Sequence, residues 1–189
     1  MAEPLRLEIS MRALRFEDWP SIHEWSQLED VYRFQVWGPN TSNVVTRKFV
    51  EVAIGQASDI PRTRFVWTAV NSDSQVIGIA ELRLHDVRSG RAEVSYTVHP
   101  KYWGLGCATQ MAGWVTEFAF AELSMHRVEA TCDSRNAASA AVLRKIGMSH
   151  EGRLRENQLI RDGWRDSELF SILESEWFRH TVTESNGNA

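Results

Sequence analysis

The chain has 189 residues, of which 43% are hydrophobic and 24% charged, and its formal net charge is −4 with a pI near 5.9. This composition is typical of a compact globular domain and excludes disordered, collagen-like and membrane-spanning classes, while the acidic balance argues against a nucleic-acid binder. Two cysteines make no disulfide framework, and residues 1–10 lack the features of a signal peptide, so we expect a cytoplasmic protein.

The first part of the chain predicts one strand and two helices. Residues 6–12 alternate apolar and polar side chains, as in a half-buried strand. The segment Asp18-Trp-Pro-Ser opens a helix, with Pro20 in the first turn, where its missing N–H costs little. Thr41 and Ser42 can cap a second helix, whose apolar face we expect to consist of Val44, Val45, Phe49, Val52 and Ala53.

The remaining segments predict six strands and two further helices. Strands over residues 64–70 and 75–85 flank a polar turn and form a hairpin, and a second turn leads into a strand over 92–98. Then follow a helix at 105–122, a strand at 126–132, a helix at 136–146, and strands at 148–160 and 167–173. This order predicts one mixed α/β domain over residues 1–182, followed by a disordered tail over 183–189.

One loop carries a chemical signal, in the segment Val98-His-Pro-Lys-Tyr-Trp-Gly-Leu-Gly-Cys-Ala-Thr109. Pro100 prevents the strand from continuing, and two glycines remove side chains from a tight turn before a helix begins. Such a turn can direct several backbone N–H groups at one point beside the positive end of a helix, which suits a pyrophosphate. The spacing is neither that of a P-loop nor that of a dinucleotide fingerprint, and a structural role for the two glycines alone is equally open.

Three segments in order resemble a known family. Lys101-Tyr-Trp-Gly-Leu-Gly106 resembles the (Gln/Arg)-x-x-Gly-x-(Gly/Ala) pattern of the GCN5-related N-acetyltransferase (GNAT) superfamily. Asn136-Ala-Ala-Ser139 and residues 147–152 resemble the second hallmark segment of its ribosomal-protein alanine acetyltransferase-like branch, and residues 163–173 resemble the final hairpin of that branch. The resemblance covers residues 6–178.

The resemblance implies a single GNAT-type domain with a splayed, mostly antiparallel central sheet flanked by helices. It also implies acetyl-CoA as the acyl donor and no metal. The pantetheine arm would lie between the strand that ends at Val98 and the next strand, against the backbone of Tyr96, Thr97 and Val98. The implied pyrophosphate-binding residues are Trp103, Gly104, Leu105, Gly106, Cys107, Ala108 and Thr109. Lys101 and Arg144 are candidates for the outer phosphates, and a solvated surface role is equally open for both.

Acyl transfer to an amine requires a base and a site for the oxyanion. Members similar to this chain place a Glu base on the strand that ends at Val98, where this sequence has Glu93, and the N–H of Val98 would face the thioester carbonyl. A simple ion pair of Glu93 with Arg83 or Arg91 is the structural alternative. Glu81, on the neighbouring strand, is the reserve base and a candidate acceptor contact.

The leaving thiolate also needs a proton donor. Many members carry a Tyr seven residues after the Asn of the second motif, and here that position is Leu143. In the branch that this chain resembles a Ser takes over near the CoA sulfur, which points to Ser139, and Asn136 is implied to contact CoA with a share in helix capping. Gln158 stands where the branch has a Glu, which argues against a ribosomal-protein acceptor.

These residues together predict an acetyl-CoA-dependent N-acetyltransferase that acts on a primary amine, either a protein N-terminus or a small metabolite or antibiotic. The acceptor would bind near the first two helices, where Trp37 is a candidate contact. Cys107 lies in the wrong place for a nucleophile, and no His, Cys or acid cluster has metal-ligand spacing. Two alternatives stay open: transfer of a larger acyl group such as succinyl, and a non-catalytic acyl-CoA-binding domain. We expect no nucleic-acid or membrane partner, and a homodimer stays open.

Overall fold

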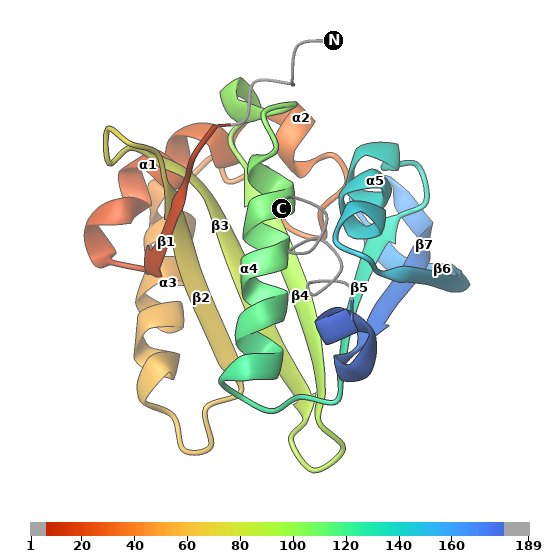
Figure 1. Cartoon of the computed structure of the whole chain (residues 1–189). Coiled ribbons are helices and arrows are strands. Elements are labelled where there is room, and N and C mark those ends of the chain that lie inside the picture. The colour runs from red at the N-terminus through yellow and green to blue at the C-terminus, as the bar shows by residue number, and fades with distance from the viewer. Residues whose placement is uncertain (1–6, 180–189) are drawn as a thin grey trace, which may run out of the picture.

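Seven strands form one open sheet in the computed structural model, which describes residues 7–179 (Figure 1). Their spatial order is β1-β2-β3-β4-β5-β7-β6, and every neighbouring pair is antiparallel except β4 and β5. The strands are β1 (Ser10–Ala13), β2 (Arg64–Val70), β3 (Val76–Asp86), β4 (Arg91–Val98), β5 (Arg127–Asp133), β6 (Ser149–Ile160) and β7 (Gly163–Leu173). The expected mixed α/β domain with a mostly antiparallel sheet is confirmed.

Helices cover both faces of this sheet. One face packs against α1 (Trp19–Ser26) and α3 (Asn43–Gly55), and the other packs against α4 (Cys107–Ala121), which crosses in front of β3 and β4 in Figure 1. The short α2 (Glu29–Tyr32), which the sequence did not predict, follows α1, and α5 (Ala137–Lys145) follows β5. Helix α4 forms because Met111, Val115 and Ala119 recur at helical spacing, and all three are fully buried.

The alternation of side chains along the strands assigns residues to the two faces. Val66 belongs to the core under α1 and α3, and the register pairs it with Glu81, which is paired in turn with Ser95. Directly paired residues share a face, so the odd-numbered residues of β4 face α1 and α3. Val94 and Val98 belong to the core under α4. The even-numbered residues of β4 therefore face α4.

The sheet splays between its two central strands. β4 and β5 pair only where residues 91–93 lie beside residues 127–129, and they separate beyond Glu93. The N–H of His99 donates to the carbonyl of Ile77 on the β3 side at 2.8 Å, so the odd-numbered backbone groups of β4 point to β3. The alternating N–H and C=O groups of Tyr96 and Val98 therefore face the gap. The expected splay is confirmed, but of the three residues expected at its open edge only Tyr96 and Val98 direct backbone groups into the gap, because the backbone of Thr97 points to β3.

The buried face of α3 differs from the sequence expectation. Thr46, Val50 and Ala53 face the core, whereas Val44 and Val45 are 67% and 53% exposed. The helix is rotated about its axis relative to the expected orientation because Thr46 can be buried: its hydroxyl hydrogen-bonds to the ring of His23 on α1 at 3.0 Å. Hydrophobic periodicity alone could not identify a Thr as the core position. The cap at Ser42 is confirmed, since its Oγ accepts from the N–H of Val44.

Other differences concern ends of elements. The first strand begins at Ser10 rather than at residue 6, helix α4 begins at Cys107 rather than 105, and β7 begins at Gly163 rather than 167. The expected tail over 183–189 lies outside the described residues. Within residues 7–179, none of the helices combines the length and the apolar character needed to cross a bilayer.

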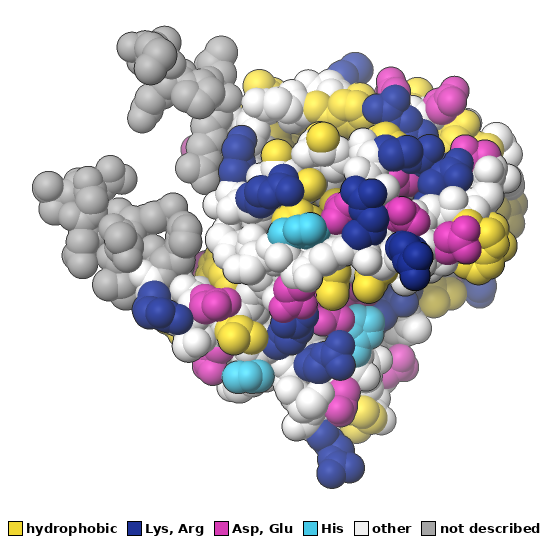
Figure 2. All heavy atoms as spheres, turned by 90° about the vertical axis from the view of Figure 1, so that its right-hand side faces the viewer, with side chains coloured by type: hydrophobic (Ala, Val, Ile, Leu, Met, Phe, Trp, Pro, Cys, Tyr) yellow, Lys and Arg dark blue, Asp and Glu magenta, His cyan; other side chains and the backbone are white. Residues whose placement is uncertain are grey.

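The face formed around β6 and β7 has no single dominant charge. Figure 2, which looks at the right-hand side of Figure 1, shows basic and acidic side chains interspersed. Several of them are paired, as Arg127 is with Glu151 at 2.6 Å and Arg153 with Glu168 at 2.6 Å. Exposed pairs of this kind contribute little stability, but they prevent this face from forming a basic patch.

Candidate active site

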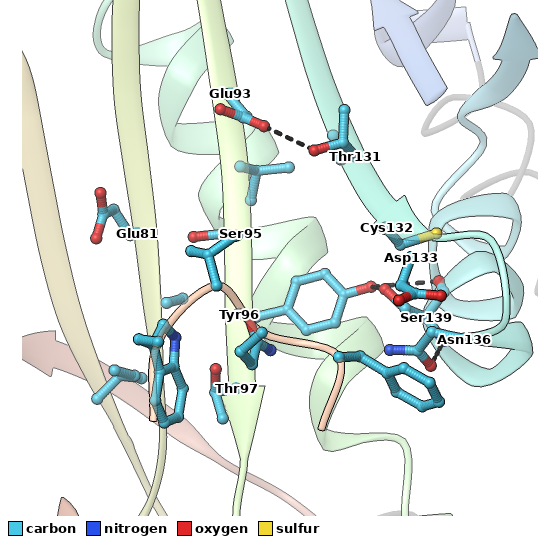
Figure 3. Close-up of a pocket in the computed structure, with 18 of the residues that line it drawn as sticks. Glu81, Glu93, Ser95, Tyr96, Thr97, Thr131, Cys132, Asp133, Asn136 and Ser139 are labelled. Carbon is cyan, nitrogen blue, oxygen red and sulfur yellow. Dashed lines mark hydrogen bonds between the residues drawn. The ribbon is translucent and has the colours of Figure 1, made fainter. Parts of the chain in front are cut away.

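A cavity of about 610 Å³ lies at the splay. Its walls come from α1, the loop after α2, α3, strands β2 to β5, α5 and the β6–β7 hairpin. Several residues that the sequence singled out line it together. Figure 3 labels Glu81, Glu93, Tyr96, Thr97, Asn136 and Ser139, and Trp37 belongs to the same lining. Val98 and the loop after it lie outside this lining, at the end of β4.

Glu93 lies where β4 and β5 begin to separate. One carboxylate oxygen accepts from the Thr131 hydroxyl at 3.1 Å, across the gap (Figure 3), and the other lies 3.2 Å from Nε2 of His85. The side chain is 31% exposed, so part of it is open to the cavity. The expected alternative partners are both engaged elsewhere, since Arg83 binds Glu81 and Arg91 binds Glu129. Glu93 is therefore a carboxylate held by a hydroxyl and an imidazole.

Glu81 has very different surroundings. Its carboxylate is 17% exposed and binds the guanidinium groups of Arg64 and Arg83, each at 2.7 Å. Burial by itself raises the pKa of Glu81, but the hydrogen bonds from Arg64 and Arg83 outweigh it and hold the pKa below its ordinary range. A carboxylate stabilised in this way is a weak proton acceptor, so its surroundings favour Glu93 over Glu81 as the base.

The hydroxyl of Tyr96 reaches from β4 to α5 (Figure 3). It lies 3.0 Å from Oγ of Ser139 and donates to the Ser139 carbonyl at 3.3 Å. Burial raises the pKa of Tyr96, so the phenol stays protonated at neutral pH. Leu143 is buried in the core under α4. The sequence pointed to the backbone of Tyr96 and missed its hydroxyl, although the alternation along β4 already placed this side chain opposite Glu93.

Asn136 begins α5. Its side-chain oxygen accepts from the N–H of Ser139 at 3.1 Å, which makes Asn136 the N-cap and confirms its expected contribution to capping the helix. The cap fixes the first turn of α5 and therefore the direction of the Ser139 hydroxyl. Asn136 lines the same cavity. Its side-chain oxygen is used in the cap, so its side-chain amide nitrogen is the group that can donate to a ligand.

The loop between β4 and α4 turns sharply at two glycines. Gly104 and Gly106 both have φ near +77°, a backbone conformation that suits glycine, and Gly106 is the N-cap of α4. The N–H of Gln110 makes the first bond back to Gly106, so the N–H groups of residues 107–109 have no partner within the helix. Unpaired N–H groups at the N-terminus of a helix can bind a phosphate or a pyrophosphate.

Side chains in this loop have mixed surroundings. The Trp103 indole donates to the carbonyl of Val98 at 2.7 Å, and Lys101 is exposed. Arg144, the other phosphate candidate, lies over the Phe170 ring at 5.2 Å. Cys107 is buried, and burial raises the pKa of its thiol, so it is a neutral core residue. Among the described residues, no group of His, Cys, Asp and Glu could hold a metal ion.

Hydrogen bonds from Arg161 hold the loop that contains Trp37, and the sequence did not reveal this contact. Arg161, in the turn between β6 and β7, donates to the carbonyls of Tyr32 at 2.6 Å, Trp37 at 2.9 Å and Gly38 at 3.2 Å. Its guanidinium also lies 4.7 Å from the centre of the Tyr32 ring. These residues are more than 120 positions apart, so no local pattern could have identified the contact. Gln158, on the same hairpin, lines the cavity.

Comparisons with known proteins agree with this geometry. A family model described as an acetyltransferase (GNAT) domain matches residues 8–149. The uncharacterized N-acetyltransferase YnaD of Bacillus subtilis is 25% identical over 167 residues, which cover 88% of this chain and 94% of the relative. The spermidine N(1)-acetyltransferase of Escherichia coli is 25% identical over 180 residues, covering 95% and 94%.

Solved structures have the same fold. A GNAT-family acetyltransferase from Bacillus anthracis superposes with a TM-score of 0.77 at 25% identity, covering 91% of this chain and 99% of that one. Spermidine N-acetyltransferase from Vibrio cholerae, in complex with CoA and spermine, superposes with a TM-score of 0.79 at 19% identity, covering 90% and 98%. The chain therefore belongs to the GNAT superfamily and is an N-acetyltransferase, of a family that transfers an acyl group from acetyl-CoA to an amine.

Proposed function

We propose that this enzyme transfers the acetyl group of acetyl-CoA to a primary amine by direct attack of the amine, with Glu93 as the base. The observation that carries the proposal is the arrangement around the splay. Glu93 faces the side of α1 and α3, Tyr96 and Ser139 face the side of α4 and α5, and all three line one cavity. A base and a proton donor on opposite sides of one gap suit transfer between two substrates that meet there.

Glu93 would take the proton of the bound ammonium group. An alkylammonium has a pKa near 10.4, so at neutral pH the amine must be deprotonated before it attacks. Glu93 is partly open to the cavity, and its contact with His85 supports passage of the proton onward, because His85 is itself 38% exposed. Thr131 fixes the other carboxylate oxygen, which reduces the freedom of the base.

The opposite side of the gap would support the departing thiolate. The hydroxyls of Ser139 and Tyr96 belong to residues that line the cavity, and they lie 3.0 Å apart. Because these two hydroxyls are within hydrogen-bond distance of each other, we assign them together as the proton donor to the thiolate, with Tyr96 returning a proton to Ser139. The N–H of Val98 points into the gap and is positioned to stabilise an oxyanion.

The finer assignment, to the ribosomal-protein alanine acetyltransferase-like branch, rests on the motifs of residues 136–152 and 163–173. Those motifs form α5, β6 and β7, which supply Asn136, Ser139 and the hairpin side of the cavity. The acceptor is then either a protein N-terminus or a small amine, and Gln158 in place of the Glu of that branch favours the small amine.

Thiol release from acetyl-CoA with a panel of primary amines tests the proposal. We expect Glu93→Gln to lower kcat by about 10²–10⁴-fold, which is the usual contribution of a general base. Glu117→Gln, the same change at an exposed position of α4, is the matched control and should leave the rate unchanged. A Glu93→Gln enzyme of normal rate would show that another group is the base. Failure of every amine to accelerate thiol release would overturn the proposed reaction.

A further inference from the structure

We infer that the acceptor is a primary monoamine on an apolar body, and that polyamines are poor substrates. This inference rests on the proposed acetyl transfer to an amine and concerns which amine the cavity accepts. It separates this enzyme from relatives named for spermidine, which carries several ammonium groups.

The first step is the charge of the cavity wall. The described residues that line it include three carboxylates and three guanidinium groups, so their formal charges cancel. The carboxylates belong to Glu81, Glu93 and Asp133, and the guanidinium groups to Arg64, Arg83 and Arg165. A polycation gains no net attraction from such a wall, in contrast to a wall with an acidic excess.

The second step is the pairing of each carboxylate. Asp133 is 4% exposed at its side chain and binds the guanidinium of Arg135 at 2.8 Å. Glu81 binds two guanidinium groups, and those hydrogen bonds hold its pKa low. Among the lining carboxylates, only Glu93 forms no ion pair with an Arg of the described residues. The cavity can therefore neutralise one ammonium, and a second would have to displace an Arg or stay unpaired in a partly dehydrated site.

The third step concerns the aromatic side chains, since aromatic rings can also receive cations. Two of the rings that line the cavity already carry guanidinium groups. Arg33 lies 4.6 Å from the centre of the Phe34 ring and Arg135 lies 5.6 Å from it, while Arg64 lies 5.5 Å from the centre of the Phe49 ring. These rings can still pack against hydrocarbon. The apolar side chains of the wall there include Trp25, Trp37, Val45 and Ile79, and they lie beside the polar Ser26, Gln35 and Asn40.

A matched pair of acceptors isolates the charge. Hexylamine and 1,6-diaminohexane have the same carbon chain and differ by one ammonium group, which is protonated at pH 8. We expect kcat/KM for hexylamine to exceed that for the diamine by at least about tenfold after correction for its two equivalent amines, because an unpaired buried ammonium is costly. Spermidine should be poorer still.

The outcomes are distinguishable. Equal or better use of the diamine or of spermidine overturns this inference and leaves the proposed acetyl transfer intact. Thiol release that no amine accelerates overturns both.

A substitution in the wall gives a second test. Arg83 is 56% exposed and shares Glu81 with Arg64, so Arg83→Gln removes one positive charge from the wall and leaves Glu81 paired. We expect the ratio of diamine to monoamine kcat/KM to rise by about threefold or more. Arg88→Gln, in the exposed turn after β3 and outside the lining, makes the same change in net charge and is the control. A ratio that shifts equally in both variants overturns the inference.

Discussion

Removal of one hydroxyl tests how the thiolate side of the site works. Tyr96→Phe deletes the contacts to Oγ and to the carbonyl of Ser139, at 3.0 and 3.3 Å, and keeps the ring in the core. One neutral hydrogen bond contributes about 0.5–1.5 kcal/mol to folding, so we expect a modest loss of stability and a decrease of Tm by about 1–6 °C. The catalytic effect should be larger, with kcat about 10²-fold lower, because the variant removes the proton source.

The assay is acetyl-CoA turnover in Tyr96→Phe, Ser139→Ala and the double variant. If the two hydroxyls act as one donor, the double variant should be little slower than the slower single variant, since groups that act together are not additive. Tyr102→Phe is the matched control: it also loses one hydroxyl contact, to Gln75 at 3.1 Å, outside the cavity lining. Fully additive losses, or a normal rate in Tyr96→Phe, would refute a shared proton donor.

Two further predictions concern the ion pairs of Glu81 and the loop that Arg161 holds. We expect Glu81→Gln to lower the free energy of unfolding at pH 7 by about 2–3 kcal/mol, because it leaves Arg64 and Arg83 without their counter-charge. The pKa of Glu81 is lower in the folded state, so the ionised carboxylate contributes its full stabilisation above the unfolded pKa of about 4.3. Denaturant unfolding should therefore show the difference in unfolding free energy between the variant and wild type becoming smaller as pH falls below that value. A difference that does not depend on pH would contradict this prediction. We expect Arg161→Ala to raise the KM of the amine about tenfold and to leave the KM of acetyl-CoA unchanged, since it releases the loop beside Trp37. Steady-state kinetics against Arg155→Ala, an exposed change on the same hairpin, measures this, and an equal rise in both KM values would count against it.

Local patterns in the sequence predicted most elements and the glycine turn that precedes α4. The alternation along residues 92–98 and the helical spacing of Met111, Val115 and Ala119 are properties of short segments, and the structure has them nearly as expected. The same holds for the turn at Gly104 and Gly106, because a sharp turn with positive φ favours glycine at those positions.

Contacts between distant segments were decided by the tertiary structure. The partners of Glu93 are His85 and Thr131 because strand register and splay bring them together, and Arg83 turns to Glu81 instead. Thr46 of α3 faces the core under α1 and α3 because His23 on α1 lies opposite it and accepts or donates a hydrogen bond.

The candidate site shows the same division. The sequence determined that this chain would form a mixed α/β acyltransferase domain with a loop suited to a pyrophosphate, since those features are encoded in local spacing and in motifs. The pairing of Tyr96 with Ser139, the hydrogen bonds of Arg161 to the loop at Trp37, and the neutral cavity wall were decided only by the fold. They depend on side chains from strands and loops that meet in space, and the distance between two side chains far apart in the chain is set by sheet register and packing rather than by sequence spacing.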